Sequence, residues 1–377
     1  SKYLQYLDRE IAMVAARLPD RRGVLQFHWG GGTPTYQSIG EIEHLFATFR
    51  SHFEFLPGAE IALEVDPRVT TFEQIDVLAK LGFNRISMGV QDFTHKVQET
   101  INRVQSVEQT RALYEHCLKR GFESINIDLI YGLPHQTEES FAETVDTVIA
   151  MRPGRVAVYS FAFVPWKSGQ QKAFDKDDLP PPETKLRLFH GAMEQFIGAG
   201  YEQIGMDHFA LPDDELARAR DKHQLHRNFM GYTTKPANGM LGFGISSIGD
   251  ISGAFVQNQK KLSRYYQALD ADRLPVHRGF ELSEDDMIRR HVISELMCNF
   301  HLDVRAVERR FGIDFADYFA RERDELLEPA RNGFLTIADD AIQVSELGRL
   351  IIRNICMVFD IYLREKSDES PVFSRTI

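Results

Sequence analysis

The sequence predicts an α/β protein: a partial (β/α) barrel followed by a mostly helical C-terminal domain. Short strands rich in β-branched residues alternate with amphipathic helices about every 30–40 residues, which is typical of parallel strands covered by helices. Polar residues stand at the C-terminal ends of these strands, where (β/α) barrels carry their active sites. From about residue 283 the pattern changes to consecutive helices.

The first element is a helix, because apolar residues recur from Leu4 to Leu18 at helical spacing, and Pro19 with the Asp20–Gly23 turn ends it. The predicted strands are Val24–Trp29, Ile61–Val65, Ile86–Val90, Ile125–Ile130, Val156–Phe163 and Gln203–Met206. The predicted helices between them are Ser38–Phe53, Thr71–Leu81, Val107–Arg120, Glu138–Met151 and Glu183–Ala199. A doubly wound open sheet has the same alternation, so spacing alone leaves both architectures open.

The remaining chain predicts a second domain. Residues 207–262 are rich in Gly, Asn, Asp and His and are expected to form loops over the strand ends, with a helix starting at Asp213-Asp214-Glu215. Helices are then expected at Glu284–Asn299, Val304–Phe311 and Phe315–Asn332, followed by a hairpin turning at Asp339-Asp340 and a last helix, Ser345–Arg364. This order is similar to a winged helix. We therefore expect a catalytic domain over residues 1–265 and a C-terminal domain over 266–377.

Composition excludes several classes of protein. The net charge of −11 argues against a broad nucleic-acid surface or attraction to anionic lipid, and the winged-helix-like part lacks a basic recognition helix. No apolar run approaches the roughly 20 residues that span a bilayer. Cys117, Cys298 and Cys356 are far apart and fall in or beside helical patterns, so we expect core cysteines, no metal ligands in this chain and a reducing, cytoplasmic location. A monomer is expected.

The strongest local motif is Gly30-Gly31-Gly32-Thr33-Pro34, directly after a predicted strand. Glycines allow backbone groups to approach a ligand without interference from Cβ. The motif is no Walker loop, because no Gly-Lys-Ser/Thr follows. The helix after Pro34 is expected to offer its N-terminal turn to an anion.

Seven segments together resemble the coproporphyrinogen oxidase branch of the radical S-adenosylmethionine (SAM) enzymes. They are His28–Tyr36, Leu63–Arg68, Ser87–Phe93, Asn126–Pro134, Ile204–Ala210, Leu225–Phe229 and Arg353–Met357, and the resemblance extends to Phe373-Ser374-Arg375. It implies a partial barrel of the radical SAM type that binds two SAM molecules beside one 4Fe–4S cluster.

The resemblance also implies roles for particular residues. Gly31, Glu64 and Ile248 would contact the first SAM, and Gly32 with Thr33 the second. Gln91, Arg103, Asp128 and Ala162 would also contact the second SAM. Position agrees for Glu64, Gln91 and Asp128, because all three end predicted strands. Arg103 lies past a strand and can bind a carboxylate through its guanidinium, although a solvated surface arginine is the alternative.

The reaction that the family implies is oxygen-independent. A reduced cluster cleaves SAM, the resulting 5′-deoxyadenosyl radical removes hydrogen from a propionate arm of coproporphyrinogen III, and loss of carbon dioxide and one electron leaves a vinyl group. Two arms react to give protoporphyrinogen IX in haem biosynthesis, and an electron donor is an implied partner. The substrate carries four carboxylates, so Arg103, Arg227 and Lys167 are candidate substrate ligands. The alternative is a relative that binds and delivers haem without decarboxylation.

Two departures from the family pattern bear on this interpretation. The family holds its cluster with cysteines spaced C-x3-C-x2-C, which we expect upstream of Ser1. Without these ligands, residues 1–377 alone are expected to have no catalytic activity. Met230 stands where the family usually has glutamine, and a thioether cannot replace the hydrogen bonds of an amide. Met230 favours the haem-delivering alternative, whereas the Met206–Phe209 block favours the oxidase.

Overall fold

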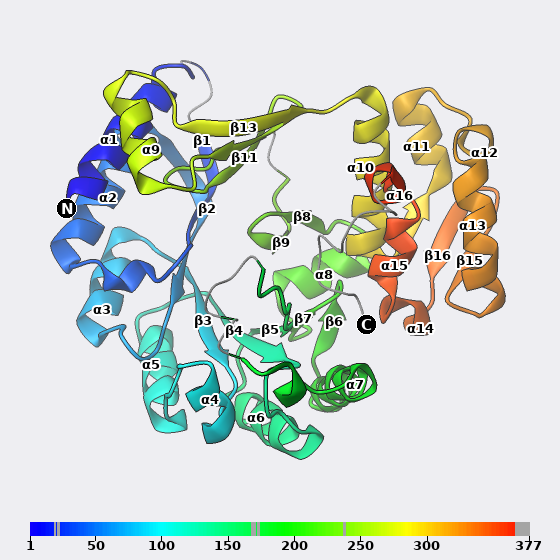
Figure 1. Cartoon of the computed structure of the whole chain (residues 1–377), viewed down its shortest axis with the longest axis horizontal. Helices are drawn as coiled ribbons and strands as arrows, with labels where there is room; N and C mark the ends of the chain where they lie inside the picture. The colour runs from blue at the N-terminus through cyan, green and yellow to red at the C-terminus, as the bar shows by residue number, and fades with distance from the viewer. Residues whose placement is uncertain (19, 21–22, 167–170, 172–173, 237–238, 366–377) are drawn as a thin grey trace. The chain divides into compact units, whose positions relative to one another are not determined.

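The structure is a computed structural model that describes residues 1–365 except 19, 21–22, 167–170, 172–173 and 237–238 (Figure 1). Backbone contacts divide the chain into two compact units. The first unit comprises Ser1–Ser87, Leu113–Ser124 and Lys235–Met287, and the second comprises Met88–Ala112, Ile125–Thr234 and Ile288–Ile377.

The main sheet has seven strands in the order β1-β2-β3-β4-β5-β7-β6. Their bounds are β1 Gly23–Trp29, β2 Glu54–Val65, β3 Arg85–Gln91, β4 Ser124–Tyr131, β5 Arg155–Ser160, β6 Glu202–Ile204 and β7 His208–Ala210. Strands β1 and β2 pair in parallel, as do β4 and β5, which agrees with the predicted alternation of strands and helices. Strand β7 is antiparallel to both β5 and β6.

The β6–β7 hairpin corrects one predicted strand. Gln203–Met206 was expected as a strand, but β6 ends at Ile204 because Gly205 has a φ of +58° and turns the chain back into β7. The predicted strand at 156–163 likewise ends early, at Ser160. The other four predicted strands are confirmed, with β2 starting seven residues earlier, at Glu54 rather than Ile61.

Three helices pack together in the first unit. Helix α1 (Lys2–Ala15) contacts both α2 (Ile39–His52) and α9 (Leu262–Asp270), as Figure 1 shows. The apolar stripe predicted for α1 is buried at Leu4, Leu7 and Ile11, against Leu45 and Phe49 of α2. Helix α3 (Phe72–Leu81) follows β2, and Thr71 caps its N-terminus with Gln74 as the reciprocal partner.

The expectation of loops over residues 207–262 is wrong. This region contains β7, α8 (Glu215–Asp221), β8 (His226–Asn228), β9 (Gly231–Thr233), β10 (Gly239–Met240), β11 (Ile248–Ile251) and β12 (Ala254–Asn258). Strands β10, β11 and β12 continue into β13 (Val276–Glu281) as an antiparallel sheet of the first unit. These strands have at most six residues, which is too short for a periodic pattern to be recognised in the sequence. The predicted helix start is confirmed, because Asp214 caps α8.

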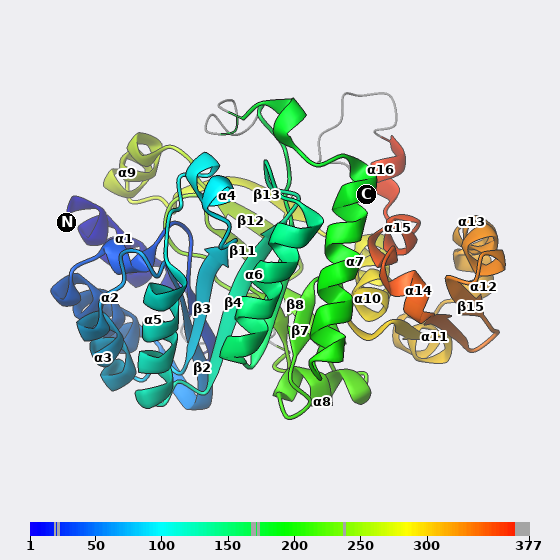
Figure 2. The same cartoon turned by 90° about the horizontal axis from the view of Figure 1, so that it is seen from below.

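In the second unit, helices cover the strands and build the C-terminal region. Figures 1 and 2 both show α6 (Glu138–Met151) and α7 (Pro182–Gly198) side by side. Helix α4 spans His95–Thr100, and α5 spans Val107–Lys119, whose residues from Leu113 onward belong to the first unit. Short 3-10 helices occur at η1 (Pro34–Tyr36), in the first unit, and at η3 (Lys176–Asp178).

The C-terminal region has the helix–helix–hairpin order expected from the sequence. Its elements are α10 (Glu284–Asn299), β14 (His301–Asp303), α11 (Val304–Phe311), α12 (Phe315–Tyr318), α13 (Ala320–Arg331), β15 (Leu335–Ile337) and β16 (Ala341–Val344). Strand β14 pairs with β16 and extends the hairpin to three strands. The predicted last helix is broken into α14 (Glu346–Arg349), α15 (Ile352–Met357) and α16 (Ile361–Glu365).

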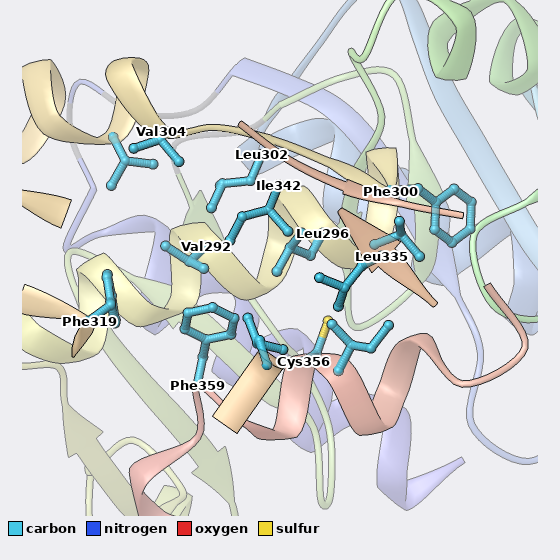
Figure 3. Packing of buried hydrophobic residues seen from close by; sticks show 14 of the residues in the cluster. Val292, Leu296, Phe300, Leu302, Val304, Phe319, Leu335, Ile342, Cys356 and Phe359 are labelled. Atoms are coloured by element: carbon cyan, nitrogen blue, oxygen red, sulfur yellow. The ribbon is translucent and has the colours of Figure 1, made fainter. Parts of the chain in front are cut away.

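One hydrophobic core holds this region together (Figure 3). Leu296 of α10, Phe319 before α13 and Leu335 of β15 are each at most 1% exposed. Cys356 and Phe359 also pack into this core, and the breaks between the three short helices let both face it. Among the described residues, no helix combines the length and the apolar character needed to cross a membrane.

Candidate active site

The three glycines after β1 serve different purposes. A Cβ on Gly30 would lie 2.6 Å from Oε1 of Glu64 and 2.7 Å from Nε2 of His28, so only glycine leaves room for these two side chains. Gly31 and Gly32 have φ values of +84° and +79°, which other residues rarely adopt, and apart from their chain neighbours no described residue has an atom within 4 Å of their Cβ positions. The loop therefore exposes its backbone to open space, as the prediction of close ligand approach requires.

Glu64 faces this loop from the C-terminal end of β2. Its Oε2 accepts the backbone N–H of Gly31 at 3.2 Å, and its Oε1 lies 3.3 Å from Nε2 of His28. Burial raises the pKa of the Glu64 carboxyl, but the hydrogen bond and charge of His28 and the Gly31 N–H outweigh burial and hold the pKa below its usual value. The side chain keeps 43% of its surface exposed. A charged carboxylate is thus available to accept from an ammonium or hydroxyl group.

The helix after the loop, where the sequence predicted an anion site, already carries a carboxylate at its N-terminus. The 3-10 helix η1 stands between Thr33 and α2 and has Thr33 at its N-cap position. The N-terminus of α2 is closed by its own capping box: Ser38 Oγ accepts the Glu41 N–H, and the Glu41 carboxylate accepts the Ser38 N–H. The capping box therefore accounts for two N–H groups at the start of α2, and an anion site at this helix stays a prediction.

Ile248, the other residue expected at the first SAM, begins β11 in the first unit. The loop before it is anchored on Glu10, which is 1% exposed. The Glu10 carboxylate accepts from the Gly244 N–H at 2.8 Å, the Asn258 amide at 2.6 Å and the Tyr265 hydroxyl at 2.6 Å. Burial raises the pKa of Glu10 despite these hydrogen bonds. A fully bonded interior carboxyl thus fixes the loop that leads to Ile248.

Gln91 and Arg103 meet in the second unit. Gln91 ends β3 with a φ of +72°, a left-handed conformation that is uncommon for a non-glycine residue and often marks a functional site. A Cβ on Gly89 would lie 2.9 Å from Nε2 of Gln91 and 3.3 Å from Nη2 of Arg103, so both side chains cross the bare backbone of this glycine. The buried Oε1 of Gln91 has no hydrogen-bond partner among the described residues. An acceptor in this position suits a ligand with hydroxyl or ammonium donors.

A buried hydrogen-bond network surrounds Asp92, the residue that follows Gln91. The carboxylate of Asp92 is fully buried. It accepts from Gln136 Nε2 at 2.5 Å, from the Thr94 N–H at 2.6 Å and from Thr144 Oγ1 at 3.2 Å. Burial raises the pKa of Asp92, although these hydrogen bonds act in the opposite direction. The network ties the turn after β3 to α6 and to the loop after β4.

The same network positions Arg103. Gln98 Nε2 donates to the carbonyls of Asp92 and Gln105 at 2.9 and 3.0 Å. Gln105 in turn donates to the Val90 carbonyl at 2.6 Å, and the Arg103 N–H donates to the Gln98 carbonyl at 2.8 Å. The backbone on both sides of Arg103 is therefore fixed to the end of β3.

Asp128 and Ala162 occupy neighbouring strand ends in the second unit. Burial along β4 alternates as predicted: Asn126 and Asp128 lie on the less buried face, and Ile127 and Leu129 are completely buried. Asn126 Nδ2 donates to Asp128 Oδ1 at 2.7 Å. Ala162 is exposed just beyond β5, and its carbonyl accepts from Gln171 Nε2 at 3.0 Å.

The predicted SAM residues thus fall into two sets, Gly31, Gly32, Thr33, Glu64 and Ile248 in the first unit, and Gln91, Arg103, Asp128 and Ala162 in the second. Direct neighbours within each set are Gly31 with Glu64, and Gln91 with Arg103.

The candidate substrate ligands are only partly described. Arg227 lies on β8, is exposed, and places its guanidinium 5.6 Å from the ring centre of Tyr232. Lys167 lies outside the described residues. Met230 is 37% exposed, and its backbone N–H donates to Asn228 Oδ1 at 2.8 Å.

The cysteines do not fit a cluster. Cys117, Cys298 and Cys356 are buried and free, and burial raises the pKa of the first two thiols to about 12 and that of Cys356 as well. Neutral, separated thiols are not the thiolate trio that an iron–sulfur cluster needs. Within the described part of the chain, no group of three His, Cys, Asp or Glu side chains is arranged to hold a metal ion.

The sequence analysis did not predict the roles of His28, Gly89 and Asp92 in the candidate site. His28 stands two residues before Gly30 on β1, so strand alternation places it on the face that meets Glu64, and this signal was available. The role of Gly89 depends on contacts with Arg103, which lies fourteen residues further along the chain, and it was not predictable. Asp92 belongs with Gln91 to the polar residues expected at strand ends, but its burial and its bonds to Gln136 and Thr144 are not visible in the sequence.

Comparison with known proteins agrees with these observations. Residues 2–148 match the model of the radical SAM superfamily, and residues 282–351 match the HemN C-terminal domain. Oxygen-independent coproporphyrinogen III oxidases from a Synechocystis strain and from Escherichia coli K12 are 44% and 46% identical, over 100% of this chain and 81% and 82% of those proteins.

The solved structure of coproporphyrinogen III oxidase (HemN) from Escherichia coli, described as a radical SAM enzyme, aligns with a TM-score of 0.93 at 46% identity and covers 96% of this chain and 83% of that one. An identity this high, over the whole chain and most of each relative, establishes the relationship. The chain belongs to the family of oxygen-independent coproporphyrinogen III oxidases.

Proposed function

We propose that the protein catalyses the oxidative decarboxylation of two propionate side chains of coproporphyrinogen III to vinyl groups, giving protoporphyrinogen IX without oxygen. The activity is the one that the names of its relatives state. The observation that carries the proposal is the open glycine loop after β1, whose Gly31 is bonded to the charged Glu64.

The residues of the loop fit SAM. Gly31 and Gly32 present bare backbone to open space, and Glu64 accepts from the ammonium or hydroxyl groups of the first SAM. For the second SAM, the unbonded Oε1 of Gln91 accepts a hydrogen bond, and Arg103 beside it offers donors to a carboxylate. When bound, SAM supplies the radical that removes hydrogen from the substrate. The chain's own residues orient the cofactor and exclude water.

The 4Fe–4S cluster does not fit the described residues, since the three cysteines are buried, neutral and apart. The family holds its cluster with cysteines spaced C-x3-C-x2-C, and we propose that such a ligand set holds the cluster of the active protein. The protein further needs an electron donor and is proposed to work in the cytoplasm as a monomer. The division into a catalytic domain over residues 1–265 and a C-terminal domain over 266–377 stays a prediction.

Product analysis tests the function. The holoenzyme with its cluster is incubated anaerobically with coproporphyrinogen III, SAM and a low-potential reductant. The expected products are protoporphyrinogen IX and 5′-deoxyadenosine, resolved by chromatography and mass spectrometry after oxidation of the porphyrinogens. Unchanged coproporphyrinogen, together with tight and stoichiometric binding of added haem, would instead establish the haem-delivering alternative.

Substitution of Met230, which stands where the family usually has glutamine, provides a second test of the proposed function. If its thioether weakens a pocket contact that glutamine would make, Met230→Gln raises the decarboxylation rate. If the rate is unchanged, this exposed position does not contact the substrate.

A further inference from the structure

A second charged cluster lies in the β6–β7 hairpin of the second unit, on strands that continue the sheet beyond β4 and β5. Asp207 ends the turn and His208 begins β7, and Asp207 Oδ1 lies 2.7 Å from Nδ1 of His208. Their side chains are 16% and 12% exposed. Burial raises the pKa of Asp207, but the charges of His208, Arg227 and Arg353 outweigh it and hold the pKa below its usual value. The carboxylate therefore stays charged in a partly dry environment.

Packing fixes the geometry of this hairpin. The Met206 N–H donates to the Tyr232 hydroxyl at 3.0 Å, and the bare backbone of Gly205 gives that hydroxyl the room it needs. The His208 ring meets the rings of Tyr159 and Tyr232 edge to face, with centroids 5.7 and 5.1 Å apart. These contacts hold the Asp207–His208 pair rigidly in place.

Two arginines converge on the pair from different parts of the second unit. Arg227 comes from β8 and stacks on Tyr232 at 5.6 Å. Arg353 comes from α15, and its charge acts on Asp207, on Tyr131 at the end of β4 and on Lys185 of α7. The Lys185 ammonium lies 5.8 Å from the centre of the Tyr131 ring, so the two side chains that the Arg353 charge influences lie together at the C-terminal end of β4, where parallel strands present their functional residues.

Neither guanidinium is in direct contact with a carboxylate in the part of the chain that the structure describes. Both side chains are exposed, and neither makes a hydrogen bond or an ion pair with any residue that the structure describes. Lys185, in contrast, donates its ammonium to the Phe161 carbonyl at 2.8 Å. Two guanidinium groups against the single carboxylate of Asp207 leave a net positive charge with unused donors, which attracts an anion.

We propose that Arg227 and Arg353 form a subsite for one carboxylate arm of the porphyrinogen substrate, with Asp207 and His208 as positioning residues. This inference rests on the proposed function. An arginine fork matches the two oxygens of a carboxylate, and binding a remote arm orients the arm that reacts. SAM also carries a carboxylate, but Arg103 beside Gln91 already offers a guanidinium for it.

Equilibrium dialysis under anaerobic conditions tests the subsite on the full chain with two separate ligands. One is coproporphyrinogen III, measured as the fluorescent porphyrin after oxidation, and the other is SAM. The variant is Arg227→Gln with Arg353→Gln. The control is Arg309→Gln with Arg321→Gln, which removes the same charge from two arginines with side chains about 70% exposed. We expect the variant to bind coproporphyrinogen at least tenfold more weakly, with unchanged SAM affinity, and the control to match the wild type.

The remaining outcomes are separable. If the variant binds coproporphyrinogen as tightly as the wild type, the subsite is wrong and the proposed function stands. If SAM affinity falls while coproporphyrinogen affinity holds, the arginines serve the cofactor and the subsite is wrong. If the wild type itself binds no coproporphyrinogen, the proposed function fails and the subsite with it. If circular dichroism shows that the double variant is unfolded, the single variant Arg353→Gln is measured in its place and judged by the same criteria.

Discussion

The backbone N–H of Gly31 donates to Oε2 of Glu64 at 3.2 Å, which joins the glycine loop after β1 to the end of β2. The other carboxylate oxygen lies 3.3 Å from His28 Nε2. One side chain therefore shapes the loop and also presents a charge beside it. The two roles can be separated by substitution, because glutamine keeps the acceptor oxygen and removes the charge.

Glu64→Gln is expected to weaken SAM binding at least about tenfold, the equivalent of roughly 1.4 kcal/mol, because the ammonium of SAM loses a charged acceptor. Equilibrium dialysis with SAM measures the change. Glu43→Gln, on the exposed face of α2, is the matched control and should bind like the wild type. Equal affinities for the Glu64 variant and the control would remove Glu64 from the SAM site.

The same residue predicts a pH effect on stability. The pKa of Glu64 is lower in the folded protein than its ordinary value of 4.5, so the unfolded state binds a proton at higher pH than the folded state does. Its contribution is therefore complete above that ordinary value and is lost as the pH falls through the lowered pKa. We expect denaturant titrations of wild type and Glu64→Gln to converge as the pH falls below that window. A constant difference at all pH values would contradict the assignment.

Gly30→Ala is expected to impair SAM binding through crowding. The new Cβ would lie 2.6 Å from Glu64 Oε1 and 2.7 Å from His28 Nε2, so the carboxylate must move. Gly40→Ala is the control, because nothing lies within 4 Å of its Cβ position on α2 and alanine favours a helix by about 0.5–1 kcal/mol. SAM affinity and the melting temperature are measured for both. Loss of SAM affinity in the Gly40 variant as well would mean that the effect is not local.

The elements that carry regular patterns were predictable from the sequence. Helix α1 was found because its apolar residues recur at helical spacing and are buried on one face, and β4 because polar and apolar residues alternate along it. The region 207–262 was not predictable, because its strands are short and form through pairing with distant partners such as β13. The breaks between α14, α15 and α16 were not predictable either, and Phe359, which lies between α15 and α16, packs into a core built from distant segments.

For the candidate site, the sequence motifs identified the residues expected to contact SAM but not the neighbouring residues that hold them in position. Glu64 and Gln91 were identified at strand ends, where position and resemblance agree. The left-handed conformation of Gln91 and the bare face of Gly89 depend on a three-dimensional network that no local pattern reveals. The sequence places Arg353 in a family motif but gives it no role. Its influence on Asp207 connects residues nearly 150 positions apart, which no local pattern reveals.

Asp92→Asn is expected to destabilise the fold by about 1–3 kcal/mol although it removes a buried charge. Asp92 accepts on both oxygens, from Gln136 on one and from Thr94 and Thr144 on the other. Gln136 cannot reverse its amide, because its oxygen accepts from the backbone of Gly132 and Leu133. Asparagine therefore leaves at least one buried donor facing another donor.

Urea denaturation measures this loss, and Asp146→Asn serves as control because Asp146 accepts from Gln195 in an exposed pair. Unchanged or increased stability of the Asp92 variant would show that the carboxyl is protonated in the folded protein, since a protonated acid already donates one hydrogen bond.

Asp128→Asn is expected to leave folding intact and to reduce decarboxylation by the holoenzyme at least about tenfold, a change of roughly 1.4 kcal/mol in the barrier. Asp128 lies on the less buried face of β4, and its Oδ1 accepts from Asn126 at 2.7 Å, a bond that asparagine can retain. The variant loses the charge and one carboxylate acceptor, and we expect a ribose hydroxyl of SAM to depend on them. A purely structural role predicts a lower melting temperature and lower cluster content instead. A folded variant with wild-type activity and stability would contradict both roles.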